Sequence, residues 1–251
     1  MNVDVILTPA ELSSLSKSDL ARTVCVVFDV LRATSAFVTA LRNGATAIIP
    51  VSEISEALEI KKKQPQVLTA GERHGVKICV RGGEFDFGNS PREFTPEKVK
   101  GRAIVSTTTN GTRALRACAR AKTVLAAAFL NLRATADFLR EKRFQAVVMV
   151  CAGTGQKAAL EDIIAAGALC ERLRQGNETS SFSDSARVAL AVFTEAKADL
   201  AGTICESENA RRLMAIPQLR DDVEFCLRRD VFDLVARMRG EKIIAANNAQ
   251  P

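Results

Sequence analysis

A polar turn between a strand-like segment and a helix-like segment has the residue types of an anion site. Four hydroxyl residues, Ser106–Thr109, end an apolar run, and the pair Asn110-Gly111 then accepts positive φ angles easily. Backbone N–H groups at the start of the following helix, with the Thr112 hydroxyl and the Arg113 guanidinium, would suit a phosphate. An ordinary strand end and helix cap explain the same residues. On its own the turn favours neither interpretation.

Acidic residues also follow several apolar runs. Asp29 ends a continuous β-prone segment, where a carboxylate could be a metal ligand, a nucleophile or the cap of the next helix. Glu161 and Asp162 open a later helix, where the helix dipole alone favours acidic residues. Carboxylates without clustered His or Cys suit Mg²⁺, which shares phosphate oxygens. The sequence thus indicates Mg²⁺-dependent phosphoryl chemistry without fixing a substrate.

Two further residues could take part in catalysis. His74, the one histidine of the sequence, lies in a glycine-flanked turn and is either a general acid or a bystander. Cys151 and Lys157 have the spacing of a cysteine-phosphatase loop, but that loop needs arginine for its planar fork. We therefore do not favour a cysteine nucleophile.

Composition restricts the class of protein. The 251 residues carry a net charge of +6, with Lys and Arg spread along the chain and neither Trp nor Tyr to stack on bases, so we do not expect a nucleic-acid partner. Seven scattered cysteines without C-x-x-C spacing indicate buried thiols in a reducing cytoplasm. Without an apolar run of about 18 residues or a signal sequence, we expect no membrane association.

Strand-like and helix-like segments alternate along the chain, which predicts a three-layer α/β/α fold with a mostly parallel sheet. Strands are expected at Val3–Leu7, Val24–Asp29, Ala47–Val51, Val67–Ala70, Ala103–Ser106, Thr123–Ala128, Ala146–Cys151 and Val223–Arg228. Helices are expected at Arg32–Arg42, Ser52–Lys63, Thr112–Ala121, Asn131–Lys142, Leu160–Arg174, Asp184–Ala198, Ser207–Ala215 and Phe232–Arg239. We expect one domain over residues 1–251, with a subdivision near 175–183 and a frayed tail from 247.

In parallel sheets, ligands bind beyond the carboxyl ends of the strands. Several polar or small residues fall at those ends, which predicts that they meet in one site: Asp29, Glu72, Thr107–Thr109, Asn131 and Cys151–Gly153.

Five motifs in order resemble the 2-phosphosulfolactate phosphatase (ComB) family, over about residues 3–240. They are Phe28-Asp29-Val30-Leu31-Arg32-Ala33-Thr34-Ser35, Ala70-Gly71-Glu72-Arg73, Phe85-Asp86-Phe87-Gly88-Asn89-Ser90-Pro91, Thr107-Thr108-Thr109-Asn110-Gly111-Thr112-Arg113-Ala114 and Leu160-Glu161-Asp162. The resemblance implies a ComB-like α/β fold and Mg²⁺-dependent hydrolysis of 2-phospho-3-sulfolactate to 3-sulfolactate and phosphate, a step toward coenzyme M.

The resemblance also implies roles for residues. The metal ligands would be Asp29, Glu72, Asp86 and Glu161. The catalytic residues would be Asp29, Arg32 and Glu72. The anionic substrate groups would be bound by Arg73, Asn89, Ser90, Thr108, Thr109, Asn110, Gly111, Thr112 and Arg113. The nucleophile stays open between Asp29 and a water molecule activated by the metal.

One segment departs from the family pattern, since Ile78–Glu84 is longer than expected and could reshape the pocket through Arg81 and Gly82-Gly83. Two alternatives therefore stay open, a phosphatase for another phosphorylated 2-hydroxy acid and a non-catalytic protein that binds anions or nucleic acid. The expected partner is a small polyanionic phosphate ester, and a homo-oligomer is compatible with the sequence.

Overall fold

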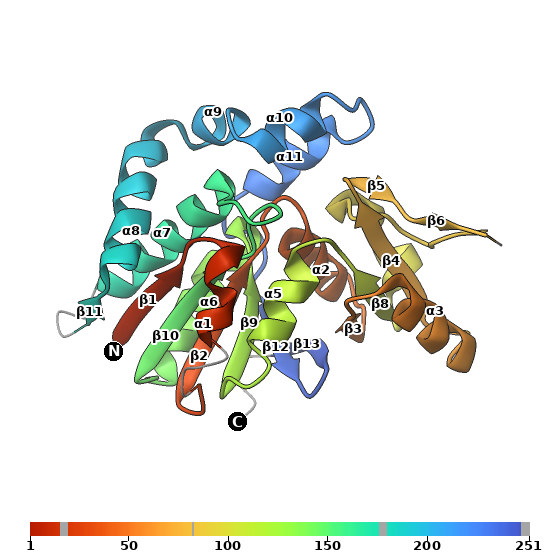
Figure 1. The fold of residues 1–251 in the computed structure, drawn as a ribbon, viewed down its shortest axis with the longest axis horizontal. Helices are drawn as coiled ribbons and strands as arrows, with labels where there is room; N and C mark the ends of the chain where they lie inside the picture. Colours follow the sequence, from red (N-terminus) through yellow and green to blue (C-terminus); the bar gives the residue numbers. More distant parts are fainter. Residues whose placement is uncertain (16–19, 82, 176–179, 247–251) are drawn as a thin grey trace.

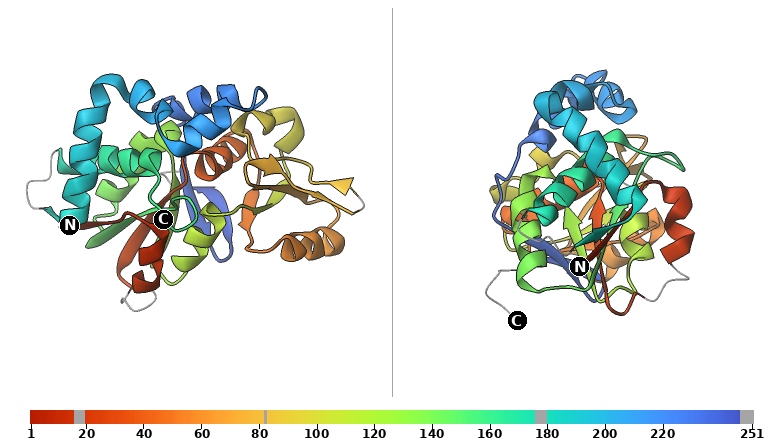
Figure 2. Two further views of the ribbon diagram at one scale, coloured as in Figure 1. Left: turned by 45° about the horizontal axis from the view of Figure 1, so that its top comes forward. Right: turned by 90° about the vertical axis from the view of Figure 1, so that its left-hand side faces the viewer.

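The computed structural model describes residues 1–15, 20–81, 83–175 and 180–246. A large mixed sheet forms the middle layer, and helices cover both of its faces (Figures 1 and 2). In spatial order its strands are β11 (Ser181–Phe182), β1 (Asn2–Ile6), β10 (Ala146–Cys151), β2 (Thr23–Phe28), β9 (Thr123–Ala127), β12 (Val235–Arg239), β13 (Lys242–Ala246), β3 (Ala47–Pro50), β8 (Ala103–Thr107), β4 (Leu68–Arg73) and β5 (Val76–Lys77). The three-layer α/β/α prediction is confirmed.

Most neighbouring strands run parallel, and the central ones are buried on both faces. Every residue of β2 is buried, as expected for an apolar strand between the parallel neighbours β10 and β9. A small separate sheet pairs β6 (Cys79–Val80) with β7 (Gly83–Glu84) beside the β4–β5 edge, as Figure 1 shows. The parallel strands form two groups, one from β11 to β9 and the other from β3 to β4, and the antiparallel hairpin β12–β13 lies between them. Because β9–β12, β12–β13 and β13–β3 are all antiparallel, the two groups have opposite senses within the sheet.

The helices follow the predicted alternation over most of the chain. They are α1 (Leu12–Leu15), α2 (Ala33–Arg42), α3 (Ile54–Lys63), α4 (Pro96–Val99), α5 (Gly111–Ala117), α6 (Leu132–Glu141), α7 (Leu160–Arg174), α8 (Asp184–Ala196), α9 (Leu200–Cys205), α10 (Glu208–Met214) and α11 (Arg220–Leu227). Short 3₁₀ turns lie at Pro9–Glu11, Pro91–Glu93, Phe129–Asn131 and Lys197–Asp199. In Figure 1, α9, α10 and α11 lie together beyond one edge of the sheet. None of the described helices is long and apolar enough to cross a membrane.

The C-terminal part differs from the prediction. The strand expected at Val223–Arg228 is wrong, because these residues belong to α11 and its C-terminal end. The helix expected at Phe232–Arg239 is also wrong, because Val235–Arg239 is β12. β12 and β13 form an antiparallel hairpin inside the sheet, where β12 pairs with β9 and β13 with β3. Pairing on both sides decides the strand conformation, which local propensity does not reveal.

Smaller differences concern boundaries. β4 continues to Arg73, past the predicted end at Ala70, because Glu72 pairs with Lys77 of β5. Asn131 does not enter the predicted site: its Oδ1 accepts from the Ala128 N–H at 2.9 Å and its Nδ2 donates to the Leu234 carbonyl at 3.1 Å, so it ties the β12 entry to the end of β9. The predicted boundary at 175–183 falls partly on residues 176–179, which, like the tail from 247, lie outside the described residues.

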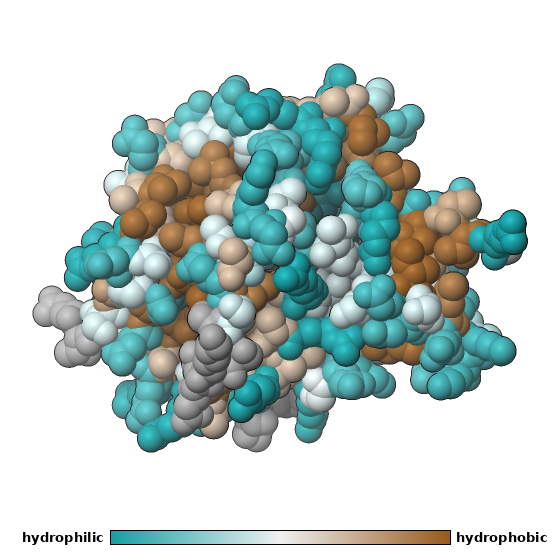
Figure 3. Space-filling model, viewed as in Figure 1, coloured by the Kyte–Doolittle hydropathy of each residue, from teal (hydrophilic) through white to brown (hydrophobic). Residues whose placement is uncertain are grey.

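Apolar side chains fill both faces of the sheet, and Figure 3 shows that some also reach the surface over α7 and α8 and beside β4 and β5. Five cysteines are buried, as predicted: Cys25, Cys118, Cys151, Cys170 and Cys226. Burial raises the pKa of the Cys170 and Cys226 thiols to about 12, so they carry almost no thiolate at neutral pH. Cys79 is exposed, contrary to the prediction of buried thiols.

We therefore expect Cys79 to react fastest with a thiol reagent such as DTNB in the native protein at pH 8, because thiolate attack requires access. Cys79→Ser should remove the fast phase, and the half-buried Cys205 provides the control, since Cys205→Ser should keep it. Fast reaction of two or more thiols in native protein would contradict the burial described above.

Candidate active site

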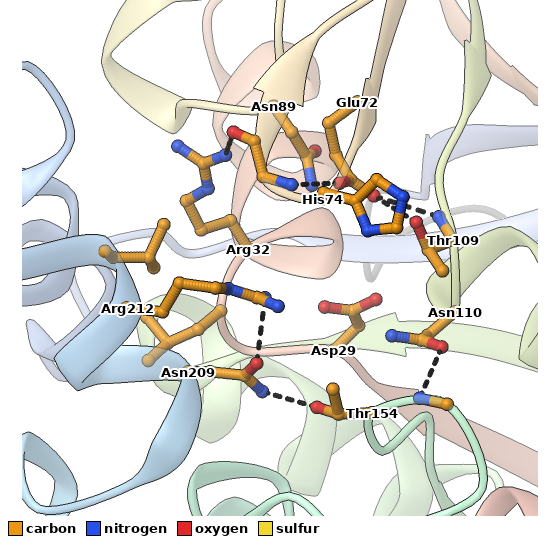
Figure 4. Close-up of a pocket in the computed structure, with 14 residues that line it drawn as sticks. Asp29, Arg32, Glu72, His74, Asn89, Thr109, Asn110, Thr154, Asn209 and Arg212 are labelled. Carbon is orange, nitrogen blue, oxygen red and sulfur yellow. Dashed lines mark hydrogen bonds between the residues drawn. The ribbon is translucent and has the colours of Figure 1, made fainter. Parts of the chain in front are cut away.

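A cavity of about 270 Å³ opens where the segments at the C-terminal ends of β2, β4, β8 and β10 meet (Figure 4). Residues of several loops and of α10 line it: Asp29, Leu31, Arg32, Glu72, His74, Gly75, Asn89, Thr109, Asn110, Thr154, Gly155, Asn209, Arg212 and Leu213. Side chains from distant segments thus meet here, including residues of four of the five motifs.

Asp29 lies at the end of β2 and points into the cavity (Figure 4). Burial raises the pKa of its carboxyl to about 7, the Ala33 N–H opposes that rise, and the carboxylates of Glu72 and Glu161 add to it. A Cβ at position 111 would lie 2.5 Å from Asp29 Oδ2, so glycine at this position lets the carboxylate reach the start of α5. Asp29 is held by the starts of two helices and still faces the cavity.

Glu72 is the best-anchored carboxylate of the site. Its Oε1 accepts from the Thr109 N–H and from the Thr109 hydroxyl, both at 2.9 Å, and its Oε2 accepts from the Gly75 N–H at 2.7 Å. These bonds join the end of β4 to the turn after β8. Thr109, which the resemblance assigned to substrate binding, therefore donates both its N–H and its hydroxyl hydrogen to a carboxylate of the protein.

The rest of that turn is largely structural. Thr108 and Thr112 are buried and bond to each other, since the Thr112 N–H donates to Thr108 Oγ1 at 3.2 Å and the Thr112 hydroxyl to the Thr108 carbonyl at 3.0 Å. Arg113 is exposed and does not line the cavity, so the structure does not bring its guanidinium to the site. Asn110 does line it, and its Oδ1 accepts from the Gly155 N–H at 3.2 Å. The turn contributes Thr109 and Asn110 to the cavity lining, and Gly111 lies against the Asp29 carboxylate.

Arg32 forms part of the cavity wall and is held from behind by a residue that sequence reasoning missed. Its Nη1 donates to Asp222 Oδ2 of α11 at 2.7 Å and its Nη2 to the Gly75 carbonyl at 2.8 Å. The Arg32 and Asp222 side chains are only 3% and 0% exposed. Asp222 Oδ1 also accepts from the Ser90 hydroxyl at 2.7 Å and from Arg92 Nε at 2.9 Å. Ser90 therefore supports the site through Asp222, whereas its neighbour Asn89 lines the cavity.

Two other predicted residues lie elsewhere. The Arg73 guanidinium turns toward Thr107 and Ser52, donating to Thr107 Oγ1 at 3.0 Å, and does not line the cavity. Asp86 is half-exposed and accepts from the Thr69 N–H at 2.7 Å. The structure brings neither one to Asp29. The described residues of Ile78–Glu84 likewise stay outside the cavity lining, and Gly82 lies outside the described residues.

Glu161 and Asp162 lie behind the cavity at the start of α7. Asp162 is buried and binds two loops, because its Oδ1 accepts from the Val30 N–H at 2.8 Å and its Oδ2 from the Gly153 N–H at 3.0 Å. Glu161 is 1% exposed, and its Oε1 accepts from Asn209 Nδ2 at 2.6 Å. Glu161 Oε2 is buried with no hydrogen-bond partner among the described residues. Such an orphaned carboxylate oxygen is unusual and needs a cation, a proton or water.

The carboxylates present fit a hard cation for which the protein supplies only some of the ligands. No three His, Cys, Asp or Glu side chains of the described segments converge as a complete metal-binding group. Asp29 faces the cavity, Glu72 lines it, and the unpartnered Glu161 oxygen adds negative charge that Asp29 senses. Mg²⁺ commonly binds one or two carboxylates and takes its other ligands from water and substrate phosphate. The set fits a hard divalent cation bound in this shared way.

Several residues that line the cavity lie outside the five sequence motifs. Asn209 and Arg212 come from α10, a helix predicted by its periodicity but not assigned to the site. His74, whose role the sequence left open, lines the cavity at the turn after β4. Cys151 is fully buried and burial raises the pKa of its thiol far above the usual range, which opposes a cysteine nucleophile.

We expect Asp222→Asn to destabilise the protein by about 3–5 kcal/mol, because it leaves the buried Arg32 cation without its carboxylate. Chemical denaturation followed by circular dichroism would measure the change. Asp221→Asn is the matched control, since the Asp221 side chain is 68% exposed and its pair with Arg92 should contribute less than about 1 kcal/mol. Equal stability of the two variants would show that the buried pair is not needed.

Comparison with known proteins agrees with this geometry. The family model described as 2-phosphosulpholactate phosphatase matches residues 7–241. A protein of Thermotoga petrophila, named "Probable 2-phosphosulfolactate phosphatase", is 41% identical over 233 residues, 93% of each chain. Proteins with the same name from Caldanaerobacter subterraneus (40% identity, 90% of this chain and 92% of the relative) and Clostridium botulinum (34%, 97% and 99%) are also similar over nearly their whole length. The chain therefore belongs to the 2-phosphosulfolactate phosphatase family.

Proposed function

We propose that this protein is a Mg²⁺-dependent phosphatase that hydrolyses 2-phospho-3-sulfolactate to 3-sulfolactate and phosphate, a step toward coenzyme M in the cytoplasm. The observation that carries the proposal is that Asp29 and Glu72, the acidic residues of two separate motifs, line one cavity in a chain that the family model covers from residue 7 to residue 241. The names of the relatives supply the substrate, and the acidic cavity supports a divalent cation.

The residues that would hold the ion are Asp29 and one of its acidic neighbours, Glu72 or Glu161. When bound, Mg²⁺ would neutralise phosphate oxygens and the charge that develops during phosphoryl transfer. Asp29 is positioned for this by the N–H groups at the starts of α2 and α5, and Glu72 by the Thr109 and Gly75 amides. These amides fix the carboxylates before the substrate arrives, which reduces the reorganisation needed during the reaction.

The anionic substrate would meet the other lining groups. A guanidinium carries five N–H donors, and the described contacts of Arg32 to Asp222 and Gly75 engage two of them, so a further edge can bind a phosphate oxygen. The side-chain amides of Asn89 and Asn110 add polar groups around the same cavity. Positioning by several fixed donors is the main contribution that a protein makes to phosphoryl transfer.

The decisive experiment is a phosphate-release assay with 2-phospho-3-sulfolactate, with Mg²⁺ and with EDTA. Asp29→Asn should lower kcat by about 100-fold or more, because the neutral amide holds a hard cation poorly. Asp86→Asn is the matched control, since Asp86 is a motif carboxylate that faces Thr69 and Lys61 instead of the cavity, and it should keep activity within about twofold.

Each alternative has its own outcome in this assay. Phosphate release at an unchanged rate in EDTA would show that the reaction does not need a metal ion. Release from other phosphorylated 2-hydroxy acids but not from 2-phospho-3-sulfolactate would change the substrate. No release from any 2-phospho acid, together with DNA affinity that falls steeply with salt, would support a binding protein instead.

A further inference from the structure

The two arginines that line the cavity differ in how their charge is balanced. The Arg32 guanidinium is paired with the buried carboxylate of Asp222. The Arg212 guanidinium lines the same cavity, but the partner described for it is an amide, Asn209 Oδ1, which accepts from Nη2 at 3.0 Å. A neutral amide orients a guanidinium without cancelling its charge. Arg212 therefore offers the cavity a cationic group that no described carboxylate pairs with.

Asn209 is itself held by hydrogen bonds, so it can orient the Arg212 guanidinium. Asn209 is 5% exposed, and its Nδ2 donates to Thr154 Oγ1 at 2.8 Å and to Glu161 Oε1 at 2.6 Å. The side chain thus uses its two donor positions on the loop after β10 and on α7, and its oxygen on Arg212. In Figure 4 the Arg212 guanidinium extends from α10 toward Asp29. The network holds this cation ready before any ligand binds.

The cavity consequently has two electrostatic sides. Asp29 and Glu72 face it from β2 and β4, with Glu161 behind, and this acidic side suits a cation together with a phosphate. Arg212 reaches the cavity from α10, and its positive charge cannot serve as a ligand for a cation. The apolar side chains of Leu31 and Leu213 also line the cavity, whereas Arg212 itself is exposed and reaches the cavity from its solvent side.

We propose that Arg212 binds a second anionic group of the substrate, a sulfonate or carboxylate, and thereby determines that the enzyme prefers phosphate esters that carry such a group. This inference rests on the proposed phosphatase function. Arg212 acts as a specificity-determining residue: its fork matches the oxygens of either anion, and the phosphate binds at the acidic side with the ion. Esters without a second anion gain nothing from Arg212.

The experiment compares kcat and KM of wild type, Arg212→Ala and Arg212→Lys on three esters: 2-phospho-3-sulfolactate, 2-phospholactate and ethyl phosphate. Arg212→Ala should lower kcat/KM for 2-phospho-3-sulfolactate by about 10- to 100-fold, mainly through KM, as expected for a lost charge-assisted hydrogen bond. Its effect on ethyl phosphate should be at least about tenfold smaller. Arg212→Lys should recover part of the loss, because it keeps the charge but not the fork.

Arg211→Ala is the matched control on the same helix. Arg211 is exposed, lies near Glu206 on the surface and does not line the cavity, so its removal should change none of the three reactions by more than about twofold. The thermal unfolding temperatures of Arg211→Ala and Arg212→Ala would verify that neither substitution disrupts the fold.

The substrate series identifies the anion. A loss confined to 2-phospho-3-sulfolactate assigns Arg212 to the sulfonate, and a loss shared with 2-phospholactate assigns it to the carboxylate. Both outcomes support the proposal, whereas an equal loss with all three esters overturns it.

A binding measurement separates this inference from the proposed function. Calorimetry would measure binding affinities. Arg212→Ala should lower the affinity for 3-sulfolactate by about tenfold or more relative to its effect on the affinity for inorganic phosphate. If wild type hydrolyses none of the esters, the proposed function fails while this binding difference still decides the role of Arg212. If the variant binds 3-sulfolactate as wild type does, the inference fails whatever the activity.

Discussion

The site depends on carboxylates that bind backbone N–H groups at the ends of parallel strands. Glu72 joins the Gly75 turn to Thr109, and Asp162 joins Val30 to Gly153, so two acidic side chains fix the loops that follow β2, β4, β8 and β10. Removing these carboxylates would leave buried amides unpaired, which is costly. The positions of Asp29 and of the other lining groups follow from this framework.

The carboxylates that fix the loops also repel one another, and this repulsion favours binding of a cation. Several carboxylates lie close together away from water, and the pKa of the Asp162 carboxyl is raised far above its usual range by burial and by Glu161 and Asp29. The proposed cation would relieve this repulsion and at the same time attract a phosphate. Stability of the loops and affinity for a cation thus both come from the same group of carboxylates.

Residues from the C-terminal helices determine how much arginine charge remains unpaired at the cavity. Asp222 of α11 neutralises Arg32, while Asn209 of α10 orients Arg212 and leaves its charge available. The β12–β13 hairpin inserts between β9 and β3, and α11 lies directly before it in the chain. The late segments of the chain therefore complete both the sheet and the cavity, although they contain none of the motifs.

The sequence by itself determined the three-layer α/β/α class, most of the strands and helices up to Ala215, and the placement of Asp29 and Glu72 at strand ends, because periodicity and strand-end chemistry are local properties of the chain. Tertiary structure decided the rest. Val235–Arg239 is a strand because β9 and β13 flank it, and Arg73, Asp86 and Arg113 leave the cavity because of the directions in which their side chains turn. Asn209, Arg212 and Asp222 could not be assigned from sequence, since their roles come from contacts with residues that lie far away along the chain.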